Sequence, residues 1–234
     1  AYYEKAGILV ARPAKGSWCT LAVSAKGGNN AENHNHNDIG SYAVALGKCT
    51  MVGDQGGPFS YPGDYFSAEA PEKYKIKGSF GHPVPVVDGK TQSSGAKASA
   101  IVLKKEFTDV KDLLCIDYTS AYSTPSLDKL VRTFVYDRQG KGSFTVGDEF
   151  TANAPIRFET AITTQANWKI IDDTHLLLTT GTEQMTVTIE ASGKVAFTSE
   201  TIEVNSPAYT RIGISLKEQS KDGYIRLTMR TKQL

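Results

Sequence analysis

The sequence of 234 residues is poor in cysteine, and the cysteines that it has are far apart. Cys19, Cys49 and Cys115 cannot all pair with one another and are too few for a disulfide framework. No Cys-x-x-Cys pair occurs, which disfavours a zinc site built from thiolates. Cys19 and Cys115 sit in apolar runs typical of strands, so we expect them to be buried free thiols.

Long apolar runs and an excess of one charge are lacking as well. No apolar run approaches the roughly 20 residues that a membrane-spanning helix needs. The formal net charge is +1, without a dense run of Lys and Arg. We therefore expect neither a membrane span nor nucleic-acid binding. A local lysine cluster consists of Lys73, Lys75 and Lys77. We expect it to be a solvated strand face, and the alternative is a binding site for an anionic ligand.

Long amphipathic helices are also absent from the pattern. Instead, strand-like runs separated by turn residues recur roughly every ten to fifteen residues. This pattern predicts an all-β fold, a large antiparallel β-sandwich with few or no helices, formed by residues 1–234 as a single domain. The predicted strands span residues 7–12, 18–24, 41–46, 49–52, 84–87, 98–103, 112–119, 130–137, 142–150, 157–163, 168–171, 175–179, 184–189, 194–198, 208–216 and 224–231. The predicted hairpin turns are Asp88-Gly89, Arg138-Gln139-Gly140, Ser192-Gly193 and Asp222-Gly223.

An aromatic-rich stretch at residues 58–75 interrupts the strands. It contains Phe59, Tyr61, Tyr65, Phe66 and Tyr74 among prolines and glycines, with no sustained period. Long loops in compact domains are usually functional. The stretch is either an aromatic plug packed on a sheet or a ligand-facing loop.

The run Asn33-His34-Asn35-His36-Asn37-Asp38 holds two of the four histidines. If it is extended, the side chains of His34 and His36 leave the same face, where they can share a metal. Imidazole and carboxylate ligands favour zinc, and a stable zinc site needs three or four ligands. Asp54 and His82 are the candidates for completing the set, whereas His175 lies in a Leu-rich strand and is expected to be structural.

Two other interpretations of this run remain. A hydrogen-bonded histidine turn without metal fits the spacing equally well. A cupin barrel uses His-x-His followed by Glu three or four positions later, but Gly40 and Ser41 occupy those positions here. The cupin interpretation therefore lacks its third ligand.

The order of these motifs resembles the C-terminal β-sandwich domain of heparinase II/III-like polysaccharide lyases. The resemblance covers roughly residues 7–165. It is carried by the run from Asn33 to Tyr42, by Val52-Gly53-Asp54-Gln55-Gly56, by Tyr61 and Tyr65, by His82 and Asp88-Gly89, and by the later runs Asp117 to Tyr122 and Val131 to Phe134. The chain departs from the family pattern at Pro83, where the family often has Asn, and it shows no evident counterpart of a usual Arg, for which Lys75 or Lys77 can stand in.

The resemblance implies a site and a reaction. His36, Asp54 and His82 would bind Zn²⁺, and His34 would face the cleft near the acidic sugar. Tyr65, or as second choice Tyr61, would assist proton transfer. Such enzymes cleave uronic-acid-containing glycans, such as heparan sulfate, other glycosaminoglycans or alginate, by removing the C5 proton and eliminating the 4-linked group.

The resemblance also implies a missing partner. In the family, an N-terminal helical toroid domain supplies much of the catalytic apparatus. This chain begins with Ala1 and shows no signal peptide, so we expect a processed or excised β-sandwich that is inactive or nearly so alone. A periplasmic or secreted location is expected by analogy. The alternative is a non-catalytic carbohydrate-binding or packing module that is stabilised by zinc and stacks sugars on its aromatic side chains.

Overall fold

The computed structural model describes residues 1–54, 57–204 and 206–232, and it confirms the predicted all-β fold. A five-stranded sheet has the order β1 (Tyr2–Tyr3), β2 (Ile8–Ala11), β3 (Leu21–Lys26), β5 (Tyr42–Leu46), β6 (Cys49–Val52). An eight-stranded sheet has the order β14 (Asn167–Asp172), β15 (His175–Thr180), β16 (Glu183–Ala191), β19 (Ser220–Thr231), β12 (Ser143–Ile156), β11 (Leu127–Asp137), β10 (Lys111–Asp117), β9 (Ile101–Phe107).

Two smaller sheets and three helical turns complete the described chain. The four-stranded sheet has the order β17 (Val195–Val204), β18 (Ser206–Leu216), β13 (Phe158–Thr164), β7 (Val86–Val87), and β4 (Asn29–Asn30) pairs with β8 (Gly95–Ser99). The helical segments are α1 (Ala70–Lys73) and the 3-10 turns η1 (Ser79–Gly81) and η2 (Thr119–Ala121). No helix among the described residues is long and apolar enough to cross a membrane.

The alternation of residues along the strands explains the layers. In β3 and β11, every second side chain is buried, because successive side chains of a strand point to opposite faces. The buried faces of the sheets form one apolar core. Near its centre the rings of Phe134 and Phe144 stack at 6.2 Å between centroids, and Tyr42 from the five-stranded sheet packs edge-on against Phe134 at 6.4 Å.

Several predicted boundaries are wrong. Trp18 is exposed and lies before β3. Asp222-Gly223 is not a turn, because Gly223 pairs with Phe150 inside the β12–β19 ladder. Lys73 lies in α1 and Lys77 is buried, so these lysines do not form a solvated strand face. Cys19 is buried as predicted, and Cys115 is half-buried. Gln55 and Gly56, which belong to the run from Val52 that carries the family resemblance, lie outside the described residues.

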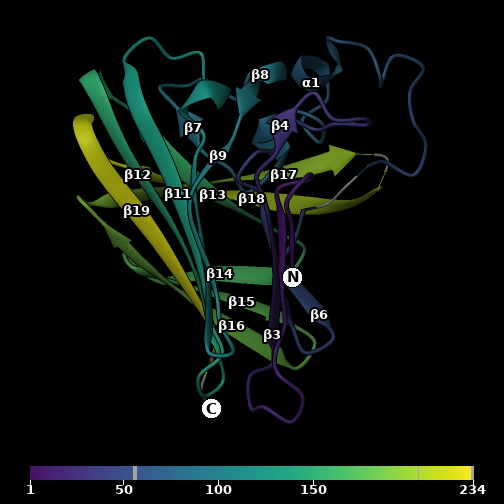
Figure 1. Ribbon diagram of the computed structural model, residues 1–234, viewed down its shortest axis with the longest axis vertical. Helices are drawn as coiled ribbons and strands as arrows, with labels where there is room; N and C mark the ends of the chain where they lie inside the picture. Colours follow the sequence, from purple (N-terminus) through teal and green to yellow (C-terminus); the bar gives the residue numbers. More distant parts are fainter. Residues whose placement is uncertain (55–56, 205, 233–234) are drawn as a thin grey trace.

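The connections between strands are distributed unevenly. Figure 1 shows α1, β4, β7 and β8 gathered at one end of the molecule, at the top of the view, while the long strands of the eight-stranded sheet run down from it. The histidine run lies between β4 and β5, and His82 directly follows η1. The fold therefore collects the polar segments of residues 29–95 at one end of the core.

Candidate metal centre and adjacent pocket

The histidine run is a turn-rich loop and not an extended segment, so the expectation that His34 and His36 leave the same face of a strand is wrong. His34 has φ of 58°, in the left-handed region that non-glycine residues seldom adopt. This reversal separates the two imidazoles. His34 is exposed, and its ring lies 5.0 Å from that of Phe66, whereas His36 is half-buried and contacts His82.

The structure brings together the three predicted metal ligands. His36 Nδ1 lies 3.2 Å from His82 Nε2, and the other ring nitrogen of His82, Nδ1, lies 3.1 Å from Asp54 Oδ1. Asp54 is oriented by the Ser41 hydroxyl, which donates to its Oδ2 at 2.7 Å. His82 is fully buried, yet the contact of its Nδ1 with Asp54 does not have hydrogen-bond geometry.

Asp38 is a further donor that the sequence analysis did not assign. Ligand atoms of Asp38, Asp54 and His82 lie within 4.8 Å of one another. Asp38 is buried and accepts a hydrogen bond from Lys26 Nζ at 2.5 Å. The only sequence signal for it was its position two residues after His36, in the same run. The described residues thus bring two imidazoles and two carboxylates close together.

The protonation of the cluster follows from burial and charge. Burial lowers the pKa of His36 to about 4, and the neighbouring His82 adds to the effect. Burial also favours the neutral form of His82, but the Asp54 carboxylate outweighs it and raises the pKa of His82. Burial raises the pKa of Asp38 against the opposing influence of His82 and Lys26. His36 is therefore neutral near pH 7, the form that binds metals.

These residues fit a divalent metal ion of the zinc type. Imidazole nitrogen and carboxylate oxygen are both zinc ligands, and neighbouring donors of a tetrahedral site with bonds of about 2.0–2.1 Å lie about 3.3 Å apart. The separation at His82 Nδ1, 3.1 Å, and the separation at His82 Nε2, 3.2 Å, are each close to this value, so a single ion could bind on either side of the ring.

The loops that carry these donors are held by buried polar side chains. The Gln92 amide bonds both the N–H and the carbonyl of Ile39, while its backbone N–H donates to Ser79 Oγ. Arg132 donates to the carbonyls of Gly40 and Pro83. These hydrogen bonds thus hold in place the loops from which the candidate metal ligands project.

The two predicted tyrosines occupy different environments. Tyr65 is 1% exposed, and its hydroxyl lies 3.4 Å from His36 Nε2. Burial, together with Tyr61, raises the pKa of Tyr65 to about 12. Tyr61 is 56% exposed and packs on Phe66 at 5.1 Å between ring centroids. The aromatic stretch therefore contains both a buried plug around Tyr65 and an exposed surface around Tyr61.

A pocket of about 380 Å³ adjoins the cluster. It is lined by Asn30, Ala31, Glu32, Asn33, His34, Asn35, Asn37, Phe66, Ser67, Ala68, Pro71, Lys77 and Ser94. Lys77 is 6% exposed, its Nζ donates to the Tyr65 carbonyl, and it lies 5.0 Å from the centroid of the Phe66 ring. The buried Oδ1 atoms of Asn30 and Asn35 have no hydrogen-bond partner. The pocket combines a cation, an imidazole, amide groups and an aromatic wall.

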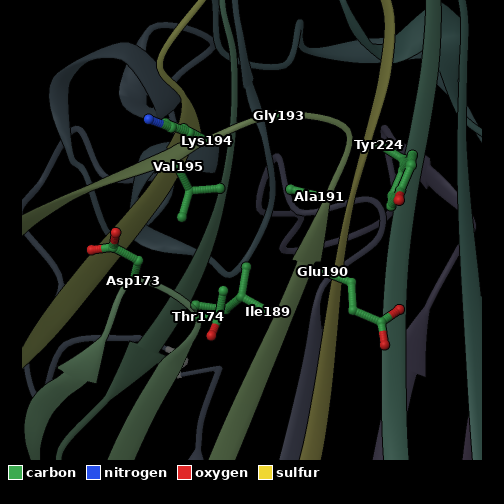
Figure 2. Close-up of a pocket in the computed structure, with 9 residues that line it drawn as sticks. All are labelled: Asp173, Thr174, Ile189, Glu190, Ala191, Gly193, Lys194, Val195 and Tyr224. Atoms are coloured by element: carbon green, nitrogen blue, oxygen red, sulfur yellow. The ribbon is translucent and has the colours of Figure 1, made fainter.

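A separate hollow of about 430 Å³ shares no described lining residue with this pocket (Figure 2). In Figure 2 the Asp173 and Glu190 side chains lie on different sides of it, and no histidine is among its described lining residues. It brings no set of metal ligands together. His175, nearby, bonds Asp172 through Nδ1 at 2.9 Å, in keeping with the structural role expected for it.

Comparison with solved structures identifies the fold. The chain superposes on heparinase III with a TM-score of 0.75 and 16% identity, covering 98% of this chain and 36% of that one. For the heparan sulfate lyase HepC from Pedobacter heparinus, the TM-score is 0.73, the identity 15%, and the coverage 92% and 34%. For the heparinase III BT4657 gene product, the corresponding values are 0.72, 14%, 99% and 36%.

The chain therefore has the fold of a heparinase-like β-sandwich, and it spans about a third of the length of the heparinases that it matches. No protein-family model matches the sequence, and no curated protein matches it either.

Proposed function

We propose that this chain is the zinc-containing β-sandwich part of a polysaccharide lyase that cleaves uronic-acid-containing glycans by β-elimination. The observation that supports the proposal is the His36–Asp54–His82 cluster together with a pocket that is lined by His34 and Lys77 and by Asn35 and Asn37, the two neighbours of His36 in sequence. The heparinase-like fold supports it. By the same analogy we infer a periplasmic or secreted location.

The pocket suits an acidic sugar. Lys77 and His34 can face a carboxylate or sulfate. In β-elimination, negative charge develops on the uronate carboxylate as the C5 proton leaves. A cation and an imidazole at this carboxylate stabilise that charge. His34 is then the residue next to the reacting sugar.

The tyrosines divide the remaining roles. Tyr61 is exposed and packs on the same Phe66 ring as His34, so we assign it the proton transfer at the sugar. Tyr65, the first candidate from the sequence, is buried against His36 and orients that imidazole. Comparing Tyr61→Phe with Tyr65→Phe in the active protein tests this assignment, because only the former should lower kcat without changing metal content.

The metal would be bound by His82, either together with Asp54 and Asp38 on the Nδ1 side of its ring or together with His36 on the Nε2 side. When bound, Zn²⁺ would hold these donors together and fix the loop from which His34 projects. Lys26 offsets part of the negative charge of the carboxylates through its bond to Asp38.

Catalysis is proposed to need a second domain. Outside the cluster, the pocket lining contains a single imidazole, His34, and one lysine, Lys77, while the exposed Tyr61 stands beside it. Heparinases of this fold are about three times as long as this chain. The remaining proton-transfer groups would come from that additional part.

The alternative function is a non-catalytic carbohydrate-binding or packing module. The observation that favours it is the exposed aromatic surface formed by Phe59, Tyr61 and Phe66, because exposed rings are platforms for sugar stacking. This function needs the pocket but no proton transfer.

Incubation of the purified chain with heparan sulfate and with alginate tests both functions. We expect binding of an acidic oligosaccharide, and no ultraviolet-absorbing unsaturated product until a helical domain from the same parent protein is added. Cleavage at normal enzyme rates by the chain alone would disprove the need for a second domain. Binding without cleavage, even with that domain, would favour the module.

A further inference from the structure

Arg132 is a charged residue buried next to the apolar core. It lies on β11, its side chain is fully buried, and all its nitrogens are bonded. Nε and Nη2 donate to the two carboxylate oxygens of Asp148, both at 2.7 Å, and Nη2 also donates to Thr160 Oγ1 at 3.0 Å. The remaining nitrogen, Nη1, bonds groups outside this network.

Nη1 of Arg132 donates to two backbone carbonyls, that of Gly40 at 2.6 Å and that of Pro83 at 2.8 Å. Gly40 lies two residues after Asp38, and Pro83 directly follows His82. One nitrogen thus bonds two of the three segments that supply candidate metal ligands, the loop of His36 and Asp38 and the loop of His82, although these two loops are more than 40 residues apart in sequence. Gly40 has φ of 87°, and a Cβ atom added to it would lie 3.5 Å from Arg132 Cδ, so the loop also packs closely on the guanidinium stem.

We propose that Arg132, held by Asp148, is a positioning residue that sets the separation of the loop of His36 and Asp38 from the loop of His82 in the metal centre. The inference rests on the metal site of the proposed function. Arg132 contacts no candidate ligand side chain, so it acts through the backbone. Groups that orient ligands in this way typically affect metal affinity about 10–100-fold.

The chemistry requires arginine at this position. A guanidinium has a rigid fork of five N–H groups, which can bond a carboxylate in a bidentate manner and still direct a third nitrogen elsewhere. A lysine ammonium retains the charge beside Asp148 but cannot reach the carboxylate, Gly40 and Pro83 with the same geometry. Arg132→Lys therefore separates positioning from charge.

The chain offers a matched control. Arg138 also bonds an aspartate, Asp112, and two backbone carbonyls, those of Arg12 and Thr108, but it contacts neither ligand loop. Arg138→Lys makes the same chemical change away from the site.

The experiment measures Zn²⁺ affinity and the visible absorption of bound Co²⁺ for the wild-type chain and both variants. We expect Arg132→Lys to bind Zn²⁺ about 10–100-fold more weakly with an altered Co²⁺ spectrum, and Arg138→Lys to match the wild type. Unchanged affinity in Arg132→Lys, or equal losses in both variants, would overturn the proposal.

Two further measurements keep the proposal testable. If Arg132→Lys does not fold, Thr160→Val removes only the hydroxyl that links Arg132 and Asp148, and we expect a smaller loss of affinity in the same direction. If the wild type binds no metal, the proposed zinc site fails by itself. Amide exchange at Ser41 and Val84 then decides the positioning role, because Arg132→Lys should accelerate it and Arg138→Lys should not.

Discussion

His82 contacts His36 through Nε2, at 3.2 Å, while its Nδ1 lies 3.1 Å from the Asp54 carboxylate. The two nitrogens of one imidazole therefore face different candidate ligands. An ion bound at Nδ1 has Asp38 and Asp54 as its neighbours, and the Nε2 side then contacts His36. An ion bound at Nε2 has His36 as its neighbour, with Asp54 accepting from Nδ1–H, as carboxylates often do for ligating histidines. His82 is needed in both arrangements.

The metal centre can be tested by comparing the two histidines of the run. We expect His82→Ala to lower Zn²⁺ affinity more than about 100-fold in either arrangement, which exceeds the cost of losing a group that only orients a ligand. His36→Ala should cause the same loss if the ion lies on the Nε2 side. His34→Ala is the matched control and should bind Zn²⁺ normally, because His34 projects toward Phe66. Metal analysis and calorimetric titration provide the measurement. A wild-type chain without metal affinity would disprove the site.

Asp38→Asn distinguishes the two arrangements. A carboxamide keeps the size of the side chain but is a poorer metal ligand. If the ion lies on the Nδ1 side, Asp38→Asn and His82→Ala both lose affinity strongly. If only His36→Ala and His82→Ala do so, the ion lies on the Nε2 side.

Lys77 is expected to contribute to the binding of acidic sugars. Lys77→Gln should weaken binding of a heparan sulfate oligosaccharide about 10-fold, because a hydrogen bond to a charged group contributes about 1.5–3 kcal/mol. Lys75→Gln is the control, since Lys75 is exposed and pairs with Glu200 outside the pocket. Calorimetry at fixed ionic strength provides the comparison, and equal losses in both variants would show only a general effect of charge.

The hydrogen bonds in the turn at residues 172–175 predict how the stability of the folded chain depends on pH in acid. The Thr174 backbone N–H, followed by the His175 and Thr174 side chains, lowers the pKa of Asp172 to about 2 from its ordinary value of 3.8. The folded state thus favours the carboxylate. This contribution to stability is fully present above pH 3.8 and is lost as the pH falls through about 2. NMR titration of the Asp172 carboxyl measures the shift, and a pKa near 3.8 would contradict it.

The core prediction concerns Phe134, which is fully buried and stacks on Phe144. Phe134→Ala should reduce the free energy of unfolding by about 3–5 kcal/mol, through lost burial and a residual cavity. Phe59→Ala, at a position 79% exposed, should change it by no more than about 0.5 kcal/mol. Urea unfolding of both variants gives the values, and similar midpoints would contradict the packing described here.

The sequence was sufficient for the fold class because alternation is a local signal. β3 and β11 alternate between buried and less buried residues, and this period is visible without any tertiary information. The residues at which strands begin and end were less predictable. Gly223 looked like a turn residue, yet its pairing with Phe150 extends β19 through it. Pairing of this kind depends on distant residues and leaves no local signature.

The site was predictable in its composition but not in its geometry. His36, Asp54 and His82 could be selected because histidine is rare in the chain and the motifs follow a family order. The left-handed conformation of His34 could not be predicted from the sequence, since it depends on the contacts that hold the loop in the folded chain. Arg132 sits in an ordinary strand pattern, and only the folded chain shows that its side chain bonds Gly40 and Pro83.

The dependence of both ligand loops on Arg132 has a consequence for biosynthesis. The candidate metal ligands all lie between His36 and His82, whereas Arg132, Asp148 and Thr160 are translated later. A nascent chain therefore presents its metal-binding side chains before the strands that hold their loops exist. Because pairings between distant segments form slowly, we expect the candidate metal centre to form only after β11 and β12 have paired. An ion bound earlier would be held by a loop whose conformation is not yet fixed, and it could be bound by the wrong side chains.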